Sequence, residues 1–371
     1  MSMRDLVANA KRIVIKIGSS TLTGSGAGLD ASAVDRLVDV VADARKRGIE
    51  VLVVSSGAIA AGLAPLGLHA RPKDLSTQQA AASVGQGLLI HRYTESFARY
   101  GITASQVLLT TTDVVRRSHY SNAQRALFKL ISMGVVPVIN ENDTVGTSEI
   151  RFGDNDRLAA IVALLTQADL LVIVSDIDAL YDAPPSDPSA KKISEVKDLN
   201  EIANIKLGGA GTGVGSGGMV TKIDAAKIST GAGTAMLLTS AADLAKAIKG
   251  EEFGTCFYSK ENKNNSRALW LAHASASSGK LVLDQGAVKA LIEKKVSLLP
   301  AGVTSLEGTF DSGDTVDLVD SNGKIIARGI VNFGSDEIPQ MLGRSTKELA
   351  ATLGAEFERE LVHRDDLVIL N

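Results

Sequence analysis

A lysine beside a glycine-serine turn is the first residue combination in this sequence that suits phosphate chemistry. Lys16 lies in the apolar run Ile13–Ile17, and Gly18 and Ser19 follow that run directly. We expect the run to be a strand that ends in a turn whose backbone N–H groups can bind an anion. A lysine there adds a positive point charge for a phosphate. An ordinary strand with a lysine at its end fits the same residues, so this motif is weak by itself.

A second lysine follows the most unusual stretch of the chain, the glycine-rich segment 208–218. Glycines can pass close to phosphates because they lack a Cβ atom. Lys222 lies near the first turn of the helix predicted over Met219–Thr230, and a helix N-terminus favours anions. A flexible linker does not explain why such a helix follows at once. The segment also contains a Gly-x-Gly-x-x-Gly spacing, but no apolar strand precedes it, and the chain has no Walker A sequence.

The residues after the second predicted strand offer groups that can bind a carboxylate. The strand Ile49–Val54 is followed by Ser55, and then by Ser56, Gly57 and Ala58. The Ser56 hydroxyl and the backbone N–H groups of this turn can donate hydrogen bonds to carboxylate oxygens. An ordinary strand-to-helix cap explains the segment at least as well.

Two dense clusters of Asn, Asp and Glu follow further along, at residues 140–143 and 152–156. Helix capping explains one such residue in each cluster but not all of them. Clustered carboxylates indicate recognition of an α-amino group, binding of a metal, or orientation of a lysine. Asp156 can pair with Lys16 and with a second lysine through charge attraction.

A possible nucleotide site follows the predicted strand Leu170–Val174. Ser175 and Asp176 come directly after it, and the backbone at a strand end can receive an adenine or a phosphate. Tyr181 can form a wall of such a site. The alternative is a simple turn with an Asx hydrogen bond. The five histidines are scattered without the spacing of a metal site, so surface or core roles are expected for them, and no individual residue is assigned as a metal ligand.

Composition limits the classes of protein that the chain can belong to. It has 371 residues, of which 45% are hydrophobic and only 4% aromatic, and its formal net charge is −3. Length predicts two domains, and a core of aliphatic residues suits a buried parallel sheet. Cys256 is the single cysteine, so no intramolecular disulfide forms. Because no run reaches the 18 or so apolar residues of a membrane span, we expect a soluble, cytoplasmic protein.

The predicted elements that position these residues alternate between strand and helix up to about residue 255. This succession predicts an α/β fold, a three-layer αβα sandwich with a mainly parallel open sheet. Pro137 lies inside one predicted strand, which suggests a sheet edge or a bulge there. The strands are expected at Arg12–Ile17, Ile49–Val54, Ser105–Leu109, Val135–Ile139, Leu170–Val174 and Thr234–Leu238, and the helices at 30–47, Leu75–Arg99, Ser121–Met133, Asn155–Gln167, Met219–Thr230 and Ala241–Ile248.

The remainder of the chain has a different residue pattern, which predicts a second, small, mostly β domain. Residues 259–280 are polar and resemble a linker, and a helix is expected at Ala287–Lys294. Turn signals follow at 311–314 and at 321–324, where an Asn-Gly pair between alternating runs predicts a hairpin.

Taken together, the motifs resemble those of the amino acid kinase family, over residues 10 to about 255 and in the family's order. The tail resembles a PUA domain through 297–303 and 313–314. Two departures are Ser175, where a threonine is more usual, and the longer glycine run before Met219. The resemblance implies a kinase domain over 1–258, a linker over 259–279 and a PUA-like domain over 280–371. The segments on which the resemblance to the amino acid kinase family rests are 14–20, 55–58, 139–143, 152–156, 175–176 and 217–222.

The resemblance also implies roles for individual residues. Lys16 and Lys222 flank the transferring phosphoryl group, and Asp156 holds both lysines in place. The acceptor-binding residues are Ser56, Gly57, Ala58, Asp143 and Asn155. The ATP-binding residues are Lys16, Gly18, Ser19, Ser175, Asp176, Ser216, Gly217, Gly218, Met219, Val220, Thr221 and Lys222, with Mg²⁺ bridging the phosphates.

The activity implied is transfer of the γ-phosphoryl group of ATP to the γ-carboxylate of L-glutamate, giving L-glutamyl 5-phosphate, the first step of proline biosynthesis. A carboxylate with an ordinary pKa of about 4.3 is ionised at pH 7 and needs no general base. The family likeness implies feedback inhibition by proline, a homodimer or homotetramer, and a partner, glutamate-5-semialdehyde dehydrogenase (glutamyl phosphate reductase), that reduces the product.

Several alternatives remain open at this stage. Acetylglutamate kinase, aspartokinase, carbamate kinase and uridylate kinase belong to the same family. A catalytically inactive amino-acid sensor is less consistent with the intact pair of lysines. An RNA-binding protein acting through the PUA-like tail is disfavoured, because residues 276–371 contain 10 Lys and Arg against 15 Asp and Glu, a net charge of −5.

Overall fold

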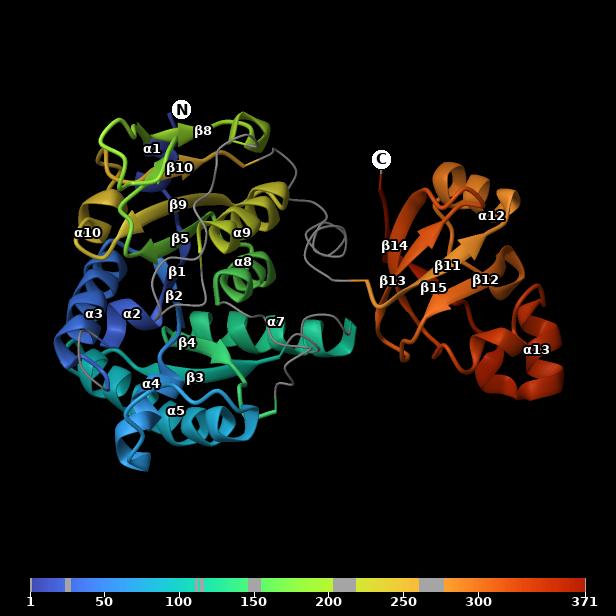
Figure 1. Cartoon of the computed structure of the whole chain (residues 1–371), viewed down its shortest axis with the longest axis horizontal. Helices are drawn as coiled ribbons and strands as arrows, with labels where there is room; N and C mark the ends of the chain where they lie inside the picture. Colours follow the sequence, from blue (N-terminus) through green and yellow to red (C-terminus); the bar gives the residue numbers. More distant parts are fainter. Residues whose placement is uncertain are drawn as a thin grey trace. The chain divides into compact units, whose positions relative to one another are not determined.

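The computed structural model describes residues 2–23, 28–110, 113, 117–145, 155–202, 218–259 and 277–370. These residues form two compact units, each with its own sheet (Figure 1). The larger unit comprises Met1–Thr111 and Asn122–Asn264 and contains β1 to β10, and the smaller comprises Thr112–Ser121 and Asn265–Asn371 and contains β11 to β15.

The larger unit is built on an eight-stranded sheet with the order β3-β4-β2-β1-β5-β9-β10-β8. All neighbouring strands are parallel except β9 and β10, which are antiparallel. The predicted mainly parallel α/β sheet is therefore confirmed. The strands are β1 (Arg12–Ile17), β2 (Glu50–Ser55), β3 (Ala104–Leu109), β4 (Val136–Glu141), β5 (Leu170–Ser175), β8 (Glu195–Val196), β9 (Ala235–Ser240) and β10 (Thr255–Phe257), beside a two-stranded sheet of β6 (Leu180–Tyr181) and β7 (Lys192–Ile193).

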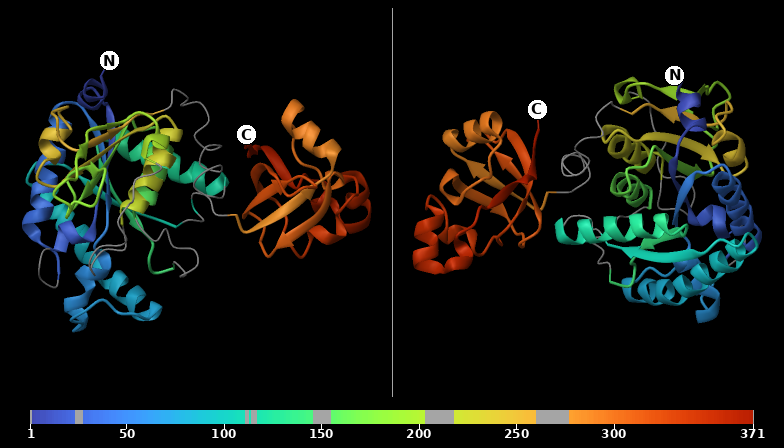
Figure 2. Two further views of the ribbon diagram at one scale, coloured as in Figure 1. Left: turned by 45° about the horizontal axis from the view of Figure 1, so that its top comes forward. Right: turned by 180° about the vertical axis from the view of Figure 1, so that it is seen from behind.

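Helices cover both faces of this sheet, which gives the three layers (Figures 1 and 2). Helices α1, α3, α5 and α10 share one apolar core with the sheet face that contains Ile13, Ile15 and Val53. Helices α8 and α9 lie on the opposite face. The helices are α1 (Met3–Ala8), α2 (Ser19–Thr23), α3 (Ala31–Lys46), α4 (Ala58–Leu63), η1 (Ala64–Leu66), α5 (Leu75–Ala98), α7 (Arg117–Ser132), α8 (Asn155–Leu165), η2 (Leu199–Ile202), α9 (Met219–Gly231) and α10 (Leu244–Ala247).

Local sequence explains where the main helices begin. Asp30 caps α3 by accepting a hydrogen bond from the Ser32 N–H at 2.9 Å, and Asp74 caps α5 by accepting one from the Thr77 N–H at 2.8 Å. The predicted helix over Ala241–Ile248 is shorter than expected, since α10 covers only Leu244–Ala247.

The short helix α4 crosses α5 at a pair of glycines. A Cβ atom on Gly85 would lie 1.8 Å from the carbonyl oxygen of Ala58, and one on Gly62 would lie 1.9 Å from that of Ala81. Only glycine permits this approach of two backbones. Because α4 begins directly after Gly57, the crossing fixes the position of the turn that ends β2.

The expectation that Pro137 marks a sheet edge or a bulge is wrong. Strand β4, which contains Pro137, has β3 on one side and β2 on the other. The ladder to β2 pairs Val53 with Val138 and Val54 with Ile139. The residue without an N–H therefore lies just before that ladder begins, where no donor is required.

The smaller unit is a five-stranded sheet with the order β12-β11-β13-β14-β15. The predicted hairpin is confirmed, because β13 and β14 are antiparallel neighbours and Asp317 pairs with Arg328. Its strands are β11 (Gly279–Leu283), β12 (Val303–Gly308), β13 (Thr315–Val319), β14 (Ile325–Val331) and β15 (Val362–Ile369), with helices α12 (Gln285–Lys289), η4 (Ala290–Lys294), η5 (Pro300–Gly302), η6 (Ile338–Gln340), α13 (Thr346–Leu353) and η7 (Ala355–Phe357). None of the described helices in either unit has the length and hydropathy that crossing a bilayer requires.

Candidate active site

Two buried lysines from distant parts of the chain meet at one buried aspartate. Lys16 Nζ lies 2.5 Å from Asp156 Oδ1, and Lys222 Nζ lies 3.2 Å from Asp156 Oδ2. Asp156 is 0% exposed, Lys16 4% and Lys222 7%. The carboxylate thus binds one ammonium group with each of its oxygens.

Three elements bring these charges together. Lys16 is the residue before the end of β1, Asp156 lies in the first turn of α8, and Lys222 lies in the first turn of α9. Thr221 adds a contact, because its hydroxyl lies 3.0 Å from Asp156 Oδ2 and 2.8 Å from the carbonyl oxygen of Gly218. The carboxyl end of a parallel strand and two helix beginnings therefore meet at one point, where open α/β sheets bind their ligands.

The cluster carries one net positive charge in a buried setting. Burial acts to raise the pKa of Asp156, but the ammonium groups of Lys16 and Lys222 outweigh it and hold that pKa below its ordinary value of 3.8. Two cations and one anion leave a surplus cation, which suits a polyanionic ligand.

A chain of amide and hydroxyl groups lies next to this charge cluster. Asn155 Nδ2 lies 2.8 Å from Ser56 Oγ and 2.9 Å from Asn140 Oδ1. Asn140 in turn donates to Gln86 Oε1 of α5 at 2.9 Å. Because Asn155 precedes Asp156 at the start of α8, the Ser56 turn and the lysine pair are held by neighbouring residues.

The turn between β2 and α4 requires a glycine and is fixed at several points. Gly57 has φ of 107°, a conformation that side-chain-bearing residues rarely adopt. The Ser56 N–H donates to the carbonyl oxygen of Ile17 at 3.1 Å, and the Ser55 hydroxyl lies 3.0 Å from the hydroxyl of Tyr93. This turn is therefore hydrogen-bonded directly to the end of β1.

The residues that follow β5 lie beside the turn that follows β1, since β1 and β5 are neighbours. Ser20 donates to Asp176 Oδ1 at 3.0 Å, and the Ile177 N–H donates to Ser175 Oγ at 3.3 Å. The local turn is thus closed by the Ser175 hydroxyl rather than by the Asx hydrogen bond considered above, and a nucleotide site at this strand end stays a prediction. Gly18 and Ser19 lie at the junction of β1 and α2.

For the remaining predicted site residues, the structure gives only the position in the chain fold or no description. Asp143 lies in the turn after β4, and Met219 and Val220 open α9 after Gly218, with Val220 exposed. Ser216, Gly217 and the cluster 152–154 lie outside the described residues. Among those that are described, no group of three or more His, Cys, Asp or Glu side chains is arranged to hold a metal.

The sequence analysis did not predict roles for several residues that contact the site. Asn140 belongs to the polar cluster at residues 140–143, but the sequence did not predict a role for Asn140 itself. Gln86 and Tyr93 lie within the long helix α5, and nothing in their local sequence distinguishes them from other surface or core residues. Their contacts depend on which strands α5 crosses, which only the fold reveals.

Comparison with known proteins agrees with this fold. The chain belongs to the amino acid kinase family, which matches residues 11–252, and a PUA domain matches residues 279–353. It is 58% identical to the glutamate 5-kinase of Streptomyces coelicolor, over 99% of both chains. It is also 56% identical to that of Thermobifida fusca, over 98% of this chain and 94% of the relative.

A solved structure shows the same fold for the larger part of the chain. The carbamate kinase of Giardia lamblia bound to AMP-PNP covers 68% of this chain and 100% of its own, with a TM-score of 0.50 and 18% identity. At that identity the likeness concerns the fold alone.

Proposed function

We propose that this protein transfers the γ-phosphoryl group of ATP to the γ-carboxylate of L-glutamate, giving L-glutamyl 5-phosphate in the first step of proline biosynthesis. The observation that carries the proposal is the convergence of Lys16 and Lys222 on Asp156 at the carboxyl end of the parallel sheet. The identity of the acceptor is supported by the full-length likeness to glutamate 5-kinases.

The chemistry requires charge neutralisation rather than a base. The attacking carboxylate is ionised at neutral pH, so the obstacle is the approach of one anion to another. The surplus positive charge of the lysine pair offsets the negative charge of the transferring phosphoryl group, and the buried setting strengthens that effect. Asp156 acts as a positioning residue, since it holds both ammonium groups with separate oxygens.

The acceptor is assigned to the turn that ends β2 and to the start of α8. Ser56, Gly57 and Ala58 offer a hydroxyl and turn amides to a carboxylate, while Asp143 and Asn155 suit an α-ammonium group. The contacts of Asn155 support its assignment to the α-ammonium group. Its Nδ2 donates to Ser56 Oγ and Asn140 Oδ1, so its side-chain Oδ1 is the atom that can accept a hydrogen bond from the ligand.

ATP is assigned to the other side of the lysine pair. Lys16, Gly18 and Ser19 are proposed to contact its phosphates, Ser175 and Asp176 to border the nucleotide, and segment 216–222 to cover the phosphates. Mg²⁺ would neutralise phosphate charge, and Mg²⁺ in such sites is usually bound by the phosphates, water and one or two carboxylates.

A hydroxamate-trapping assay tests the function directly, because hydroxylamine captures an acyl phosphate as it forms. The unmodified protein is incubated with ATP, Mg²⁺ and either L-glutamate, N-acetyl-L-glutamate or L-aspartate. We expect hydroxamate with L-glutamate alone. A product with N-acetylglutamate or aspartate instead would assign the chain to another branch of the family. ADP release without hydroxamate from any of the acids would overturn the carboxylate acceptor.

The wider setting is proposed on the family likeness. We propose a cytoplasmic homodimer or homotetramer, inhibited by proline, whose product is reduced by glutamate-5-semialdehyde dehydrogenase. The proposed domains are a kinase domain over 1–258, a linker over 259–279 and a PUA-like domain over 280–371. With its net charge of −5, the tail is not expected to bind nucleic acid.

A further inference from the structure

A fully buried tyrosine lies behind the proposed acceptor site, and the chemistry above does not use it. Tyr93 of α5 is 0% exposed, and its ring stacks on Phe97 with centroids 6.3 Å apart. Its hydroxyl lies 3.0 Å from Ser55 Oγ at the end of β2. Burial raises the pKa of Tyr93 above its ordinary value of 10.0, outweighing the hydrogen bond to Ser55, so the phenol keeps its proton at neutral pH.

The number of protons sets the direction of this hydrogen bond. The Ser55 hydroxyl has a single proton, and it donates that proton to the carbonyl oxygen of Ser56 at 3.0 Å. Ser55 Oγ must then accept from the Tyr93 hydroxyl. The result is a continuous path of hydrogen bonds from α5, through Ser55, to the backbone of Ser56.

The Ser56 carbonyl belongs to the peptide group that Ser56 shares with Gly57. A trans peptide group is planar, and its C=O and N–H point in opposite directions. Anchoring the Ser56 oxygen therefore also directs the Gly57 N–H. Such an anchor is useful here, because glycine by itself does little to restrict the rotation of neighbouring peptide groups.

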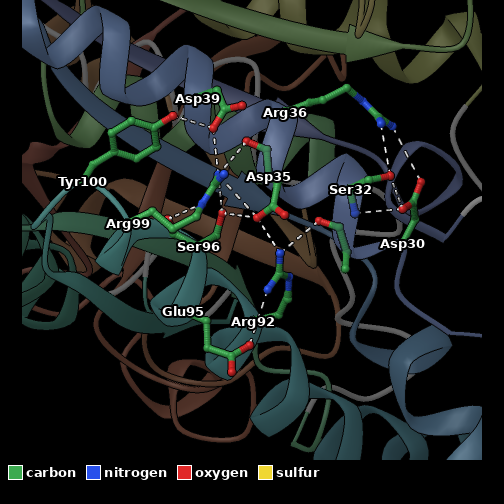
Figure 3. Close-up of polar contacts among 11 residues, drawn as sticks. Asp30, Ser32, Asp35, Arg36, Asp39, Arg92, Glu95, Ser96, Arg99 and Tyr100 are labelled. Carbon is green, nitrogen blue, oxygen red and sulfur yellow. Dashed lines mark hydrogen bonds and ion pairs between the residues drawn. The ribbon is translucent and has the colours of Figure 1, made fainter.

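Helix α5 is a rigid base for this path. On either side of Tyr93, Arg92 and Ser96 both bind Asp35 of α3, Ser96 with its hydroxyl at 2.6 Å (Figure 3). Further along, Arg99 donates to Asp39 at 2.7 Å. These contacts join α5 to α3 around Tyr93, and both helices pack in the apolar core shared with the sheet.

We propose that Tyr93 is a positioning residue that directs the Gly57 N–H at the carboxylate of the phosphoryl acceptor. This inference depends on the proposed function, which assigns Gly57 to the glutamate site. Tyr93 itself does not contact the substrate, and its influence passes through Ser55 and Ser56.

The test is a kinetic comparison of Tyr93→Phe with the unmodified protein. The substitution removes one oxygen atom and keeps the ring. We expect the KM for glutamate to rise about five- to tenfold, which corresponds to the loss of one hydrogen bond, while the KM for ATP stays unchanged. Ser55→Ala should produce the same rise, and the double variant should add nothing, because both substitutions break one path.

Tyr100→Phe is the matched control. Tyr100 follows α5, and its hydroxyl donates to Asp39 at 2.7 Å, on the network of Figure 3. This control should leave both KM values unchanged. KM does not depend on the folded fraction, so reduced stability alone does not imitate the expected result.

Three results would overturn the inference: an unchanged KM for glutamate in Tyr93→Phe, an equal rise in both KM values, or full additivity with Ser55→Ala. A different result marks failure of the proposed function, namely that the unmodified protein forms no glutamyl hydroxamate. An active enzyme insensitive to Tyr93→Phe would reject the role of Tyr93 and leave the proposed function standing.

Discussion

Asp156 is the residue on which the charge arrangement of the site depends. It is buried, and each of its oxygens contacts one ammonium group. Without it, Lys16 and Lys222 would be two buried like charges that repel each other. The carboxylate therefore stabilises the fold locally and keeps both cations directed at one point.

The substitution Asp156→Asn should lower both activity and stability. Leaving two buried cations without their partner is expected to cost about 3–5 kcal/mol at pH 7. Because the pKa of Asp156 is lowered in the folded protein, its contribution is fully present above its ordinary value of 3.8 and is lost as pH falls below that value. Urea unfolding at a series of pH values measures this as a difference between variant and unmodified protein that shrinks in acid.

Asp178→Asn provides a surface control for that measurement. Asp178 pairs with Lys192, whose side chain is exposed, and should contribute no more than about 1 kcal/mol. Equal destabilisation by the two substitutions would contradict the importance assigned to the buried cluster.

Sequence and structure agree on the lysine-aspartate cluster but not on everything around it. The pairing of Asp156 with Lys16 and a second lysine was predicted from charge attraction, and the family resemblance identified the second lysine as Lys222. The amide chain through Asn140 and Gln86 did not, because it depends on where α5 crosses the sheet. Side-chain contacts between distant elements have no local sequence signal.

At the scale of elements, the crossing of α4 and α5 determines where the turn proposed to bind the acceptor lies. The two helices approach so closely at Gly62 and Gly85 that a side chain would overlap a backbone carbonyl. Since α4 begins at Ala58, any displacement of the crossing would also move Gly57 and Ser56.

Gly85→Ala is expected to destabilise the protein by about 3 kcal/mol or more, because the added methyl group meets backbone atoms that cannot move aside. Gly87→Ala in the same helix is the control, since a Cβ there has no neighbour within 4 Å. That change should stabilise α5 by about 0.5–1 kcal/mol. Urea denaturation of both variants decides the matter, and similar effects would contradict the close crossing.

Long elements with clear patterns were predicted well, and short ones were not. Capping by Asp30 and the apolar spacing that follows it located α3, and the helix expected over Leu75–Arg99 covers the whole of α5 and one residue more. Strands β8 and β10 contain two and three residues, too few to show alternation. The prediction of a sheet edge or bulge at Pro137 was wrong because the missing N–H of proline matters only where a ladder hydrogen bond would form.

At the scale of the whole molecule, the parallel sheet gathers residues that are far apart in the sequence. The ends of β1, β2 and β5 lie side by side, so the turns after them meet where the site is proposed. All charged members of the site, Lys16, Asp156 and Lys222, belong to the larger unit. The smaller unit has its own sheet and its own apolar core.

Because the site lies in the larger unit, residues 1–258 alone should retain the activity. Domains with their own core commonly fold alone, and we expect kcat to remain within about threefold of that of the full chain. The truncated protein is first checked for cooperative thermal unfolding and then assayed by hydroxamate trapping. A folded but inactive truncated protein would show that the smaller unit is required for catalysis.

The central claim is that two lysines neutralise the transferring phosphoryl group, and the kcat of Lys222→Ala tests it most directly. Lys227→Ala is the control, because Lys227 lies in the same helix, is exposed and pairs with Asp224 at 3.0 Å. The account predicts that kcat of Lys222→Ala falls about 10²- to 10³-fold while the KM for glutamate stays within about threefold, and that Lys227→Ala behaves like the unmodified protein. An unchanged kcat in Lys222→Ala would contradict it.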